Sequence, residues 1–308
     1  MTNWLLQAAA VALILAATFI GPAIALAFLI RRKRQRRALR RSPLTKNLLR
    51  SPGQSVKEQL DEATSDLGFD LMALALFPVL VIALYLAQQQ ALGMRAAALS
   101  WVLPIYGGAI TLFVAYQVRK LVRAGHRIDD LRAGYDAELA VGQELDQLMR
   151  EGARVFHDFP ADKFNIDHVV ICASGLFAVE TKGFTKPRDI EGRAAATVTF
   201  DGKTLKFPTW TTEEPLDQAV RQAQWLARWA SSAVGEPVSG TPVLVLPGWF
   251  VERKGRGNTR VISAGEVNSI LSRTSSGLSA QLVQRIAHQV EQECRIVEPE
   301  YRDDLAKV

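Results

Sequence analysis

Residues 165–182 have the sequence NIDHVVICASGLFAVETK, which predicts two short strands joined by a turn at Ser174-Gly175. Successive side chains of a strand point to opposite faces, so Glu180 and Lys182 share one face. A two-residue turn at Ser174-Gly175 would place Asp167 opposite Lys182, with Glu180 one diagonal step away. A three-residue turn would separate Asp167 from Glu180, because a one-residue slip moves every side chain to the other face. With the shorter turn, two carboxylates and one ammonium group gather on one face of the sheet.

Two carboxylates beside a lysine suit the hydrolysis of phosphodiester bonds. That reaction needs a metal ion that polarises the phosphate and generates hydroxide near neutral pH. Asp167 and Glu180 offer the hard oxygen ligands that Mg²⁺ prefers, and Lys182 can orient the attacking water or neutralise charge on the phosphoryl oxygens. Glu180 and Lys182 could instead form an ordinary cross-strand ion pair. Their position inside an apolar hairpin favours the metal site.

The segments around the hairpin predict a layered α/β domain over residues 134–300. Both faces of the hairpin are apolar away from the acidic cluster, which is typical of central strands covered on both sides. Residues 134–151 have the apolar spacing of an amphipathic helix. This helix carries Glu138 on its first turns, where the carboxylate could complete a metal shell or accept a proton. A second helix is expected over residues 212–234, where a capping residue precedes acids and a proline, and it displays Gln218 and Gln222.

Three long segments without charged residues predict transmembrane helices. They are residues 4–30, 71–90 and 96–118, and each has the roughly 20 residues needed to cross a hydrocarbon core. We expect transmembrane helix 1 within residues 1–30 and a transmembrane hairpin, helices 2 and 3, within residues 67–118. The spans carry no charged residue, which disfavours a pore or a carrier.

Basic residues indicate how these spans are oriented. Positive charge in short flanks stays cytoplasmic, and Lys and Arg are concentrated in residues 31–41 and again after residue 118. The N-terminus is therefore expected outside, followed by a basic cytoplasmic linker at 31–66 and a cytoplasmic connector at 119–133, with a tail at 301–308. This layout predicts a multi-pass protein of the cell inner membrane, with three spans, N-out, and a cytoplasmic catalytic domain. Residues 31–41 are expected to contact anionic lipids, with a nucleic-acid contact as the alternative.

The charge of the chain is divided between its two halves. Residues 1–133 carry 17 Lys and Arg against 7 Asp and Glu, whereas residues 134–308 carry 20 against 24. The overall charge of +6 therefore reflects membrane flanks and is not evidence for nucleic-acid binding. Cys172 and Cys294 are the two cysteines, and we expect them to be unpaired thiols in a reducing compartment.

Residues 134 to about 250 resemble the NERD (nuclease-related) domain, a branch of the PD-(D/E)XK restriction-endonuclease-like superfamily. Residues 134–148, GYDAELAVGQELDQL, resemble the family's opening glycine–glutamate helix motif, with Glu138 at the glutamate. Residues 164–182, FNIDHVVICASGLFAVETK, resemble its I-D-H-V-V…G-x-F-x-(I/V)-E-(T/V)-K core. Residues 214–226, EPLDQAVRQAQWL, resemble its N-P-x-x-Q helix, with Gln218 at the glutamine.

The resemblance implies a restriction-endonuclease-like mixed central sheet flanked by helices, an α/β fold preceded here by the three transmembrane helices. It implies DNA processing, with RNA as the other possible substrate, and Mg²⁺ or Mn²⁺ as the cofactor. The metal ligands that it implies are Asp167, Glu180 and Glu138, and the catalytic residues are Asp167, Glu180, Lys182, Glu138 and Gln218. Two positions depart from the family's pattern, because Ala137 replaces a glycine and Glu214 replaces an asparagine.

Two functions follow as hypotheses. The first is a membrane-anchored, cytoplasmic, metal-dependent nuclease that hydrolyses phosphodiester bonds in DNA. The alternative is a non-catalytic binding or scaffold module that keeps the nuclease fold and is tethered to the inner membrane. The acidic balance of residues 134–308 and the extra acid at Glu214 favour the alternative, whereas the complete set of charged core residues favours the enzyme.

Overall fold

The computed structural model describes residues 20–21, 24–36, 44–91, 103–271 and 277–299. Most of the expected first span, the end of the basic segment 31–41, the start of the third span and the tail 301–308 lie outside these residues. The chain divides into two units, of which one contains Asp61–Ile128 and the other contains Lys46–Leu60 and Asp129–Pro299.

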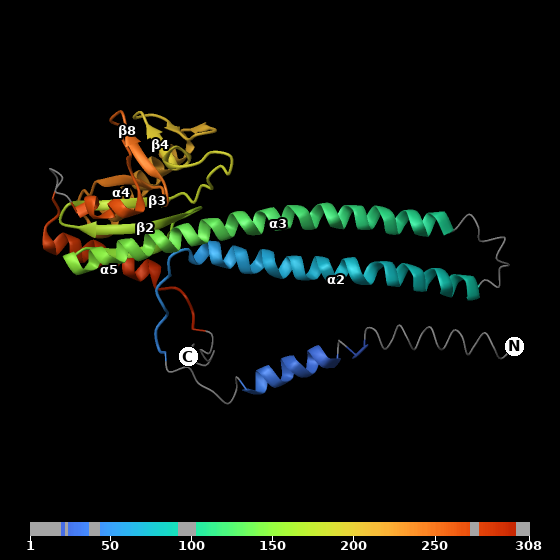
Figure 1. Ribbon diagram of the computed structural model, residues 1–308. Helices are drawn as coiled ribbons and strands as arrows, with labels where there is room; N and C mark the ends of the chain where they lie inside the picture. The colour runs from blue at the N-terminus through green and yellow to red at the C-terminus, as the bar shows by residue number, and fades with distance from the viewer. Residues whose placement is uncertain (1–19, 22–23, 37–43, 92–102, 272–276, 300–308) are drawn as a thin grey trace. The chain divides into compact units, whose positions relative to one another are not determined.

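The first unit contains most of α2 (Gln54–Ala91) and the beginning of α3 (Leu103–Gln147). These two helices lie side by side in antiparallel directions (Figure 1), with the rings of Phe77 and Phe113 stacked at a centroid distance of 3.9 Å. A second contact joins the two helices, where Lys120 Nζ of α3 lies 2.6 Å from Asp70 Oδ1 of α2. The segments that the sequence assigns to helices 2 and 3 therefore form a helical hairpin.

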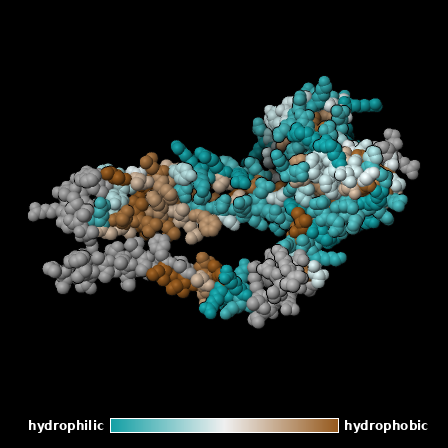
Figure 2. Space-filling model, turned by 180° about the vertical axis from the view of Figure 1, so that it is seen from behind, coloured by the Kyte–Doolittle hydropathy of each residue, from teal (hydrophilic) through white to brown (hydrophobic). Residues whose placement is uncertain are grey.

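The outer surface of this helical pair is strongly hydrophobic. Figure 2 shows this surface in brown on α2 and α3. Among the described residues, one helix, Gln54–Gln88, is long and apolar enough to cross a membrane by its length and composition. The large apolar side chains exposed on the pair are Phe69, Leu71, Met72, Val79, Leu80, Ile82, Leu84 and Leu86 of α2, and Leu103, Ile105, Leu112, Tyr116, Val118 and Val122 of α3.

The two helices extend beyond the predicted spans. Residues 54–66, expected in a linker, are the first turns of α2, and residues 119–133, expected in a connector, are part of α3. The helix predicted at 134–151 is therefore the end of a 45-residue helix, followed by the 3₁₀ helix η2 (Leu148–Glu151). The second unit spans residues 129–299, where the prediction set the domain at 134–300, and it also includes residues 46–60.

The second unit is built on a mixed sheet, as the α/β prediction requires. Among the described residues this sheet has five strands in the order β1-β2-β3-β7-β9. The pairs β1–β2 and β2–β3 are antiparallel, whereas β3–β7 and β7–β9 are parallel. The strands are β1 (Arg154–Pro160), β2 (Asn165–Cys172), β3 (Gly175–Thr181), β7 (Gly240–Val245) and β9 (Arg260–Ile262).

Helices cover both faces of this sheet (Figure 1). On one face, α4 (Glu214–Val234) and α5 (Ala280–Cys294) bury Val169, Ile171 and Ala178. On the other face, the end of α3, η2 and the 3₁₀ helix η4 (Ala264–Leu271) bury the alternate side chains of the same strands, including Val170 and Phe177. Strands with two apolar faces are buried on both sides, so β2 and β3 lie at the centre of the domain.

A smaller sheet stands beside the main one. Among the described residues it has the order β6-β5-β4-β8, with η3 (Arg193–Ala196) preceding β4. Its core packs Leu205, Phe207 and Trp249 against Leu244 of β7. The strands are β4 (Thr197–Phe200), β5 (Leu205–Lys206), β6 (Thr211–Thr212) and β8 (Phe250–Arg253).

The register of the β2–β3 hairpin differs from the prediction. Cys172 pairs with Gly175, so the turn consists of Ala173-Ser174, and the expected turn at Ser174-Gly175 is wrong. The ladder continues to His168↔Val179, which places Asp167 next to Glu180 instead of opposite Lys182. The turn is held from outside, because Ser174 Oγ donates to Leu271 O at 2.7 Å and Leu278 N donates to Ala173 O at 2.9 Å. The shift is two residues, an even number, so Asp167 and Glu180 still share a face.

Candidate active site

The acidic cluster forms where β2 and β3 meet α3 and α4. Asp167 lies near the start of β2 and Glu180 near the end of β3, and Lys182 follows that strand. Glu138 comes from α3. The carboxyl groups of Glu138, Asp167 and Glu180 act on one another electrostatically, since Glu180 raises the pKa of both of the others. The structure thus brings together these four residues, which are distant in sequence.

Glu180 is the best-anchored acid of the cluster. It is 2% exposed, and its Oε1 lies 2.7 Å from Lys182 Nζ. Its Oε2 accepts a hydrogen bond from Gln222 Nε2 of α4 at 2.6 Å. Burial lowers the pKa of Lys182, but the charge and hydrogen bond of Glu180, together with Asp167, outweigh burial and raise the pKa above its ordinary value. Lys182 is therefore an ammonium group at neutral pH.

Asp167 and Glu138 retain protons more strongly than ordinary acids do. Burial of its carboxyl group, with the charges of Glu180 and Glu138, raises the pKa of Asp167 well above its usual range, although Asp167 Oδ2 accepts a hydrogen bond from Thr181 N at 2.7 Å. Burial also raises the pKa of Glu138 to about 8, with further contributions from Asp158 and Glu180. Full ionisation of all three carboxyl groups would leave more negative charge than Lys182 compensates, which is why two of them retain protons.

A divalent cation would supply the missing positive charge, and the oxygen donors of the cluster are the type that Mg²⁺ and Mn²⁺ prefer. The chemistry of the donor set therefore fits such an ion. Within the described ranges, no three His, Cys, Asp or Glu side chains lie at the spacing of a formed metal site. The carboxylates thus share an electrostatic environment without forming a closed set of ligands.

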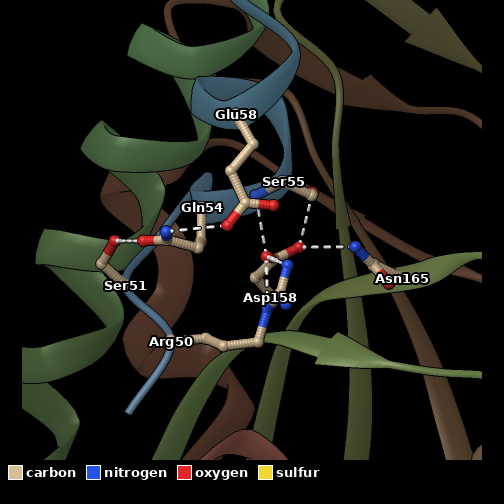
Figure 3. Close-up of polar contacts among 7 residues, drawn as sticks. All are labelled: Arg50, Ser51, Gln54, Ser55, Glu58, Asp158 and Asn165. Atoms are coloured by element: carbon tan, nitrogen blue, oxygen red, sulfur yellow. Dashed lines mark hydrogen bonds and ion pairs between the residues drawn. The ribbon is translucent and has the colours of Figure 1, made fainter. Parts of the chain in front are cut away.

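Asp158 is a charged residue of this region that the sequence did not single out. It lies in edge strand β1, is 1% exposed and has a left-handed backbone with φ of 49°. Figure 3 shows its carboxylate held by Arg50, Ser55 and Asn165. Arg50 Nε donates to Oδ2 at 2.7 Å, Ser55 Oγ donates to Oδ1 at 2.7 Å, and Asn165 Nδ2 donates to Oδ1 at 3.1 Å. Its charge contributes to the raised pKa of Glu138.

Asp158 also caps a helix from a distant part of the chain. Ser55 N, in the first turn of α2, donates to Asp158 Oδ2 at 2.8 Å. The first N–H groups of a helix lack partners within the helix, and a carboxylate there is favoured by the helix dipole. Arg50 and Ser55 are thereby bonded to strand β1 of the domain. No local sequence pattern predicts this connection.

The structure separates the roles of two glutamines on α4. Gln218, the glutamine of the motif, lines a cavity together with Gln222, and it is Gln222 that bonds to Glu180. The two residues lie four apart and therefore on the same side of the helix. This spacing was visible in the sequence, and it could have identified Gln222 as a second candidate.

The two departures from the family pattern have local explanations. Glu214 is exposed, and its charge helps to raise the pKa of Lys182, so the extra acid does lie near the site. Ala137 packs closely against Gly183, where an added Cβ would lie 2.7 Å from the Cβ of Ala137. The small residue at 183 leaves room for the alanine at 137.

Comparison with known proteins identifies the segment that contains this cluster. Residues 133–247 match the family model of NERD, the nuclease-related domain. The matched range includes Glu138, Asp167, Glu180, Lys182 and Gln218. No curated protein and no solved structure gave a match. Residues 133–247 of this chain are therefore similar to the NERD, or nuclease-related, domain, consistent with the PD-(D/E)XK-like nuclease superfamily.

Proposed function

We propose that this protein is a membrane-anchored, metal-dependent nuclease that hydrolyses phosphodiester bonds in DNA at the cytoplasmic side of a bacterial inner membrane. The observation that carries the proposal is the contact between Glu180 and Lys182 at 2.7 Å, in a cluster where Glu138 and Glu180 are buried and Asp167 is partly buried. The NERD match covers these four residues and supports a nuclease-related function for the segment.

Each residue of the cluster has a distinct task in this proposal. Glu138, Asp167 and Glu180 would hold Mg²⁺ or Mn²⁺, which supplies Lewis-acid polarisation of the phosphate when bound. Lys182 offers a fixed ammonium group for charge that develops on the phosphoryl oxygens. Gln222 and Lys182 keep the Glu180 carboxylate in one orientation, and Thr181 N does the same for Asp167.

The membrane part of the proposal rests on the helical pair. The apolar surface of α2 and α3 suits a lipid environment, and α2 contains a segment able to cross a bilayer. The ion pair between Lys120 and Asp70 lies at one end of the predicted hairpin, where a charged side chain costs less free energy than at the centre of a membrane. The anchor would comprise three spans with the N-terminus outside, and residues 31–41 would contact anionic lipids.

A cleavage panel tests the enzymatic part. The full-length chain is incubated with linear, circular and single-stranded DNA, and with RNA, in Mg²⁺, Mn²⁺ or EDTA. We expect metal-dependent cleavage of DNA that Asp167→Ala and Lys182→Ala each abolish. Asp189→Ala and Lys203→Ala change exposed residues of the same types and should retain cleavage. Equal cleavage by all four variants would identify a contaminating nuclease and overturn the proposal.

The second candidate is a non-catalytic module that keeps the nuclease fold. The charge of Glu214 near Lys182 favours it, since another acid hinders the approach of a phosphate. Titration of the folded chain with Mn²⁺ distinguishes the two functions. A chain that neither binds Mn²⁺ nor cleaves any substrate of the panel would establish the non-catalytic module.

A further inference from the structure

A cavity of about 510 Å³ lies beside Glu180. Its volume falls within the roughly 300–1,000 Å³ of typical small-molecule sites. One wall is the segment after β1, and the other is the exposed side of the first turns of α4. The lining residues are Asp162, Lys163 and Phe164 from the segment and Gln218, Arg221, Gln222 and Trp225 from the helix. Gln222 joins the cavity to the acidic cluster through its hydrogen bond to Glu180.

Two aromatic rings form the apolar part of the cavity. Phe164 and Trp225 meet edge to face, with a centroid distance of 5.7 Å and an interplanar angle of 76°. Trp225 is fixed, because its Nε1 donates to Asp162 Oδ2 at 3.3 Å and its ring lies near Phe159. Phe164 is 37% exposed. An aromatic side chain that is partly exposed in a cavity offers a stacking surface for a nucleobase.

A buried acceptor lies in the same wall. Gln222 is 2% exposed, and its Nε2 donates to Glu180 Oε2 and to Asn165 O. Its Oε1 has no hydrogen-bond partner among the described residues. A buried polar atom without a partner is costly. This oxygen is shielded from the cavity, so Gln222 contributes to the wall through the hydrogen bonds that hold its side chain against Glu180 and Asn165.

Charge at the rim suits the backbone of the same ligand. Lys163 and Arg221 are exposed and line the cavity, so both can contact phosphates. The cavity thus combines an aromatic ring, amide groups and cations, and one of its lining residues, Gln222, bonds to Glu180. This combination matches a nucleotide better than a purely apolar or a purely anionic ligand.

We propose that this cavity binds an unpaired nucleobase of the DNA strand that the cluster cleaves. The inference rests on the proposed function and specifies its substrate as DNA that is single-stranded or frayed at the site. A paired base is stacked inside the duplex and cannot enter a cavity, so it must first be unpaired and unstacked. Single-stranded DNA carries no such cost and should bind more tightly than a blunt duplex.

Binding without cleavage tests this inference. The full-length chain in EDTA is titrated into a fluorescein-labelled single strand or its blunt duplex, and anisotropy is recorded. A strand carrying 2-aminopurine is measured in parallel, since its fluorescence is quenched when the base stacks. We expect tighter binding of the single strand, and a loss of about ten-fold in its affinity in Phe164→Ala, together with loss of quenching. Duplex affinity should not change in this variant.

Matched variants separate the cavity from general effects. Phe250→Ala removes an aromatic ring that is 51% exposed on the smaller sheet and should not change single-strand binding. Arg221→Ala should weaken binding, whereas Arg228→Ala, an exposed arginine further along α4, should not. Thermal denaturation of every variant checks that the fold is retained.

The outcomes distinguish this inference from the nuclease proposal. Equal single-strand affinity of the Phe164→Ala variant and the wild type, or preference for duplex, would overturn the cavity assignment even if DNA is cleaved in Mg²⁺. Binding that depends on Phe164 in a chain that cleaves nothing in Mg²⁺ would support the cavity and overturn the nuclease.

Discussion

Arg50 and Asp158, 108 residues apart in sequence, form a buried, charge-assisted pair in which Arg50 Nε lies 2.7 Å from Asp158 Oδ2. The side chains are 11% and 1% exposed. The pair ties the segment before α2 to the edge strand of the main sheet. A residue of the predicted linker is thus part of the structure of the nuclease-related domain.

We expect Arg50→Met to lower the free energy of unfolding by about 3–5 kcal/mol, because it leaves the Asp158 carboxylate buried without its cation. Chemical denaturation followed by tryptophan fluorescence measures the change. Arg228→Met, at an exposed position of α4, serves as the control. A double-mutant cycle with Asp158→Asn, which retains a residue tolerant of positive φ, isolates the energy of the pair. An equal effect of the two arginine variants would contradict the expectation.

Gln222 should matter more for catalysis than Gln218, because only Gln222 donates to Glu180 among the described contacts. We expect Gln222→Leu to lower kcat and the apparent affinity for Mn²⁺ by roughly 10–100-fold, the range found for residues that orient metal ligands. Gln218→Leu should cause a smaller loss. Steady-state kinetics and Mn²⁺ titration of both variants test this order, and a larger effect at Gln218 would restore the motif glutamine as the principal one.

The apparent affinity for Mg²⁺ should increase as the pH rises through about 8. Burial first, then the charges of Asp158 and Glu180, raises the pKa of Glu138 to about 8, so this acid must lose a proton before it can bind a cation. The concentration of Mg²⁺ that gives half-maximal cleavage measures the effect. Glu138→Gln should remove this dependence on pH, and a dependence that persists in the variant would assign it to another group.

Without metal, the same pKa shift should reduce stability at high pH. A carboxyl group whose pKa is raised in the folded state stabilises the fold fully at a pH below its unfolded pKa of 4.5. This stabilisation is lost as the pH rises through the folded pKa of about 8. The Tm of the metal-free protein should therefore decrease over this range by more in the wild type than in Glu138→Gln. Added Mg²⁺ should raise the Tm more at high pH than at low pH.

At low pH, a buried histidine should limit stability. Burial, together with the neighbouring His157, lowers the pKa of His168 well below 6.5. His168 Nδ1 lies 2.9 Å from His157 Nδ1, and His157 Nε2 lies 3.0 Å from Asp146 Oδ1. A histidine whose pKa is lowered in the folded state stabilises the fold fully at a pH above its unfolded pKa of 6.5. This stabilisation is lost as the pH falls towards the folded pKa. Tm measurements below pH 6.5 should show a shallower decrease in His168→Leu than in the wild type, whereas His288→Leu, at an exposed position, should follow the wild type.

An arginine on the apolar surface of α2 should impair membrane integration. Leu80 is 41% exposed on that surface, and an arginine in the middle of a span costs about 2.5–3.5 kcal/mol. We expect the wild type and Leu80→Ala to resist alkaline carbonate extraction and to require detergent, with a larger released fraction for Leu80→Arg. Release of the wild type by carbonate alone would contradict the anchoring proposal.

Local patterns predicted the part of the site that lies on consecutive residues. The two-residue period of a strand placed Glu180 with Lys182, and the assumption of a two-residue turn added Asp167 to the same face. The mixed sheet flanked by helices agrees with the prediction. The register was wrong by two residues, because contacts of Ala173 and Ser174 with Leu278 and Leu271 hold the turn. These contacts join residues about a hundred positions apart, so no local pattern contains them.

By itself, the sequence determined the apolar helical segments, the strand pair with its acids and the match of residues 133–247 to the NERD family model. These features depend on periodicity and motifs that span a few residues. Only the tertiary structure decided the turn of the β2–β3 hairpin, the choice of Gln222 as the partner of Glu180 and the burial that raises the pKa of Glu138 and Asp167. The physical reason is that hydrogen bonding, desolvation and charge interaction depend on distances in space, which folding sets between distant segments.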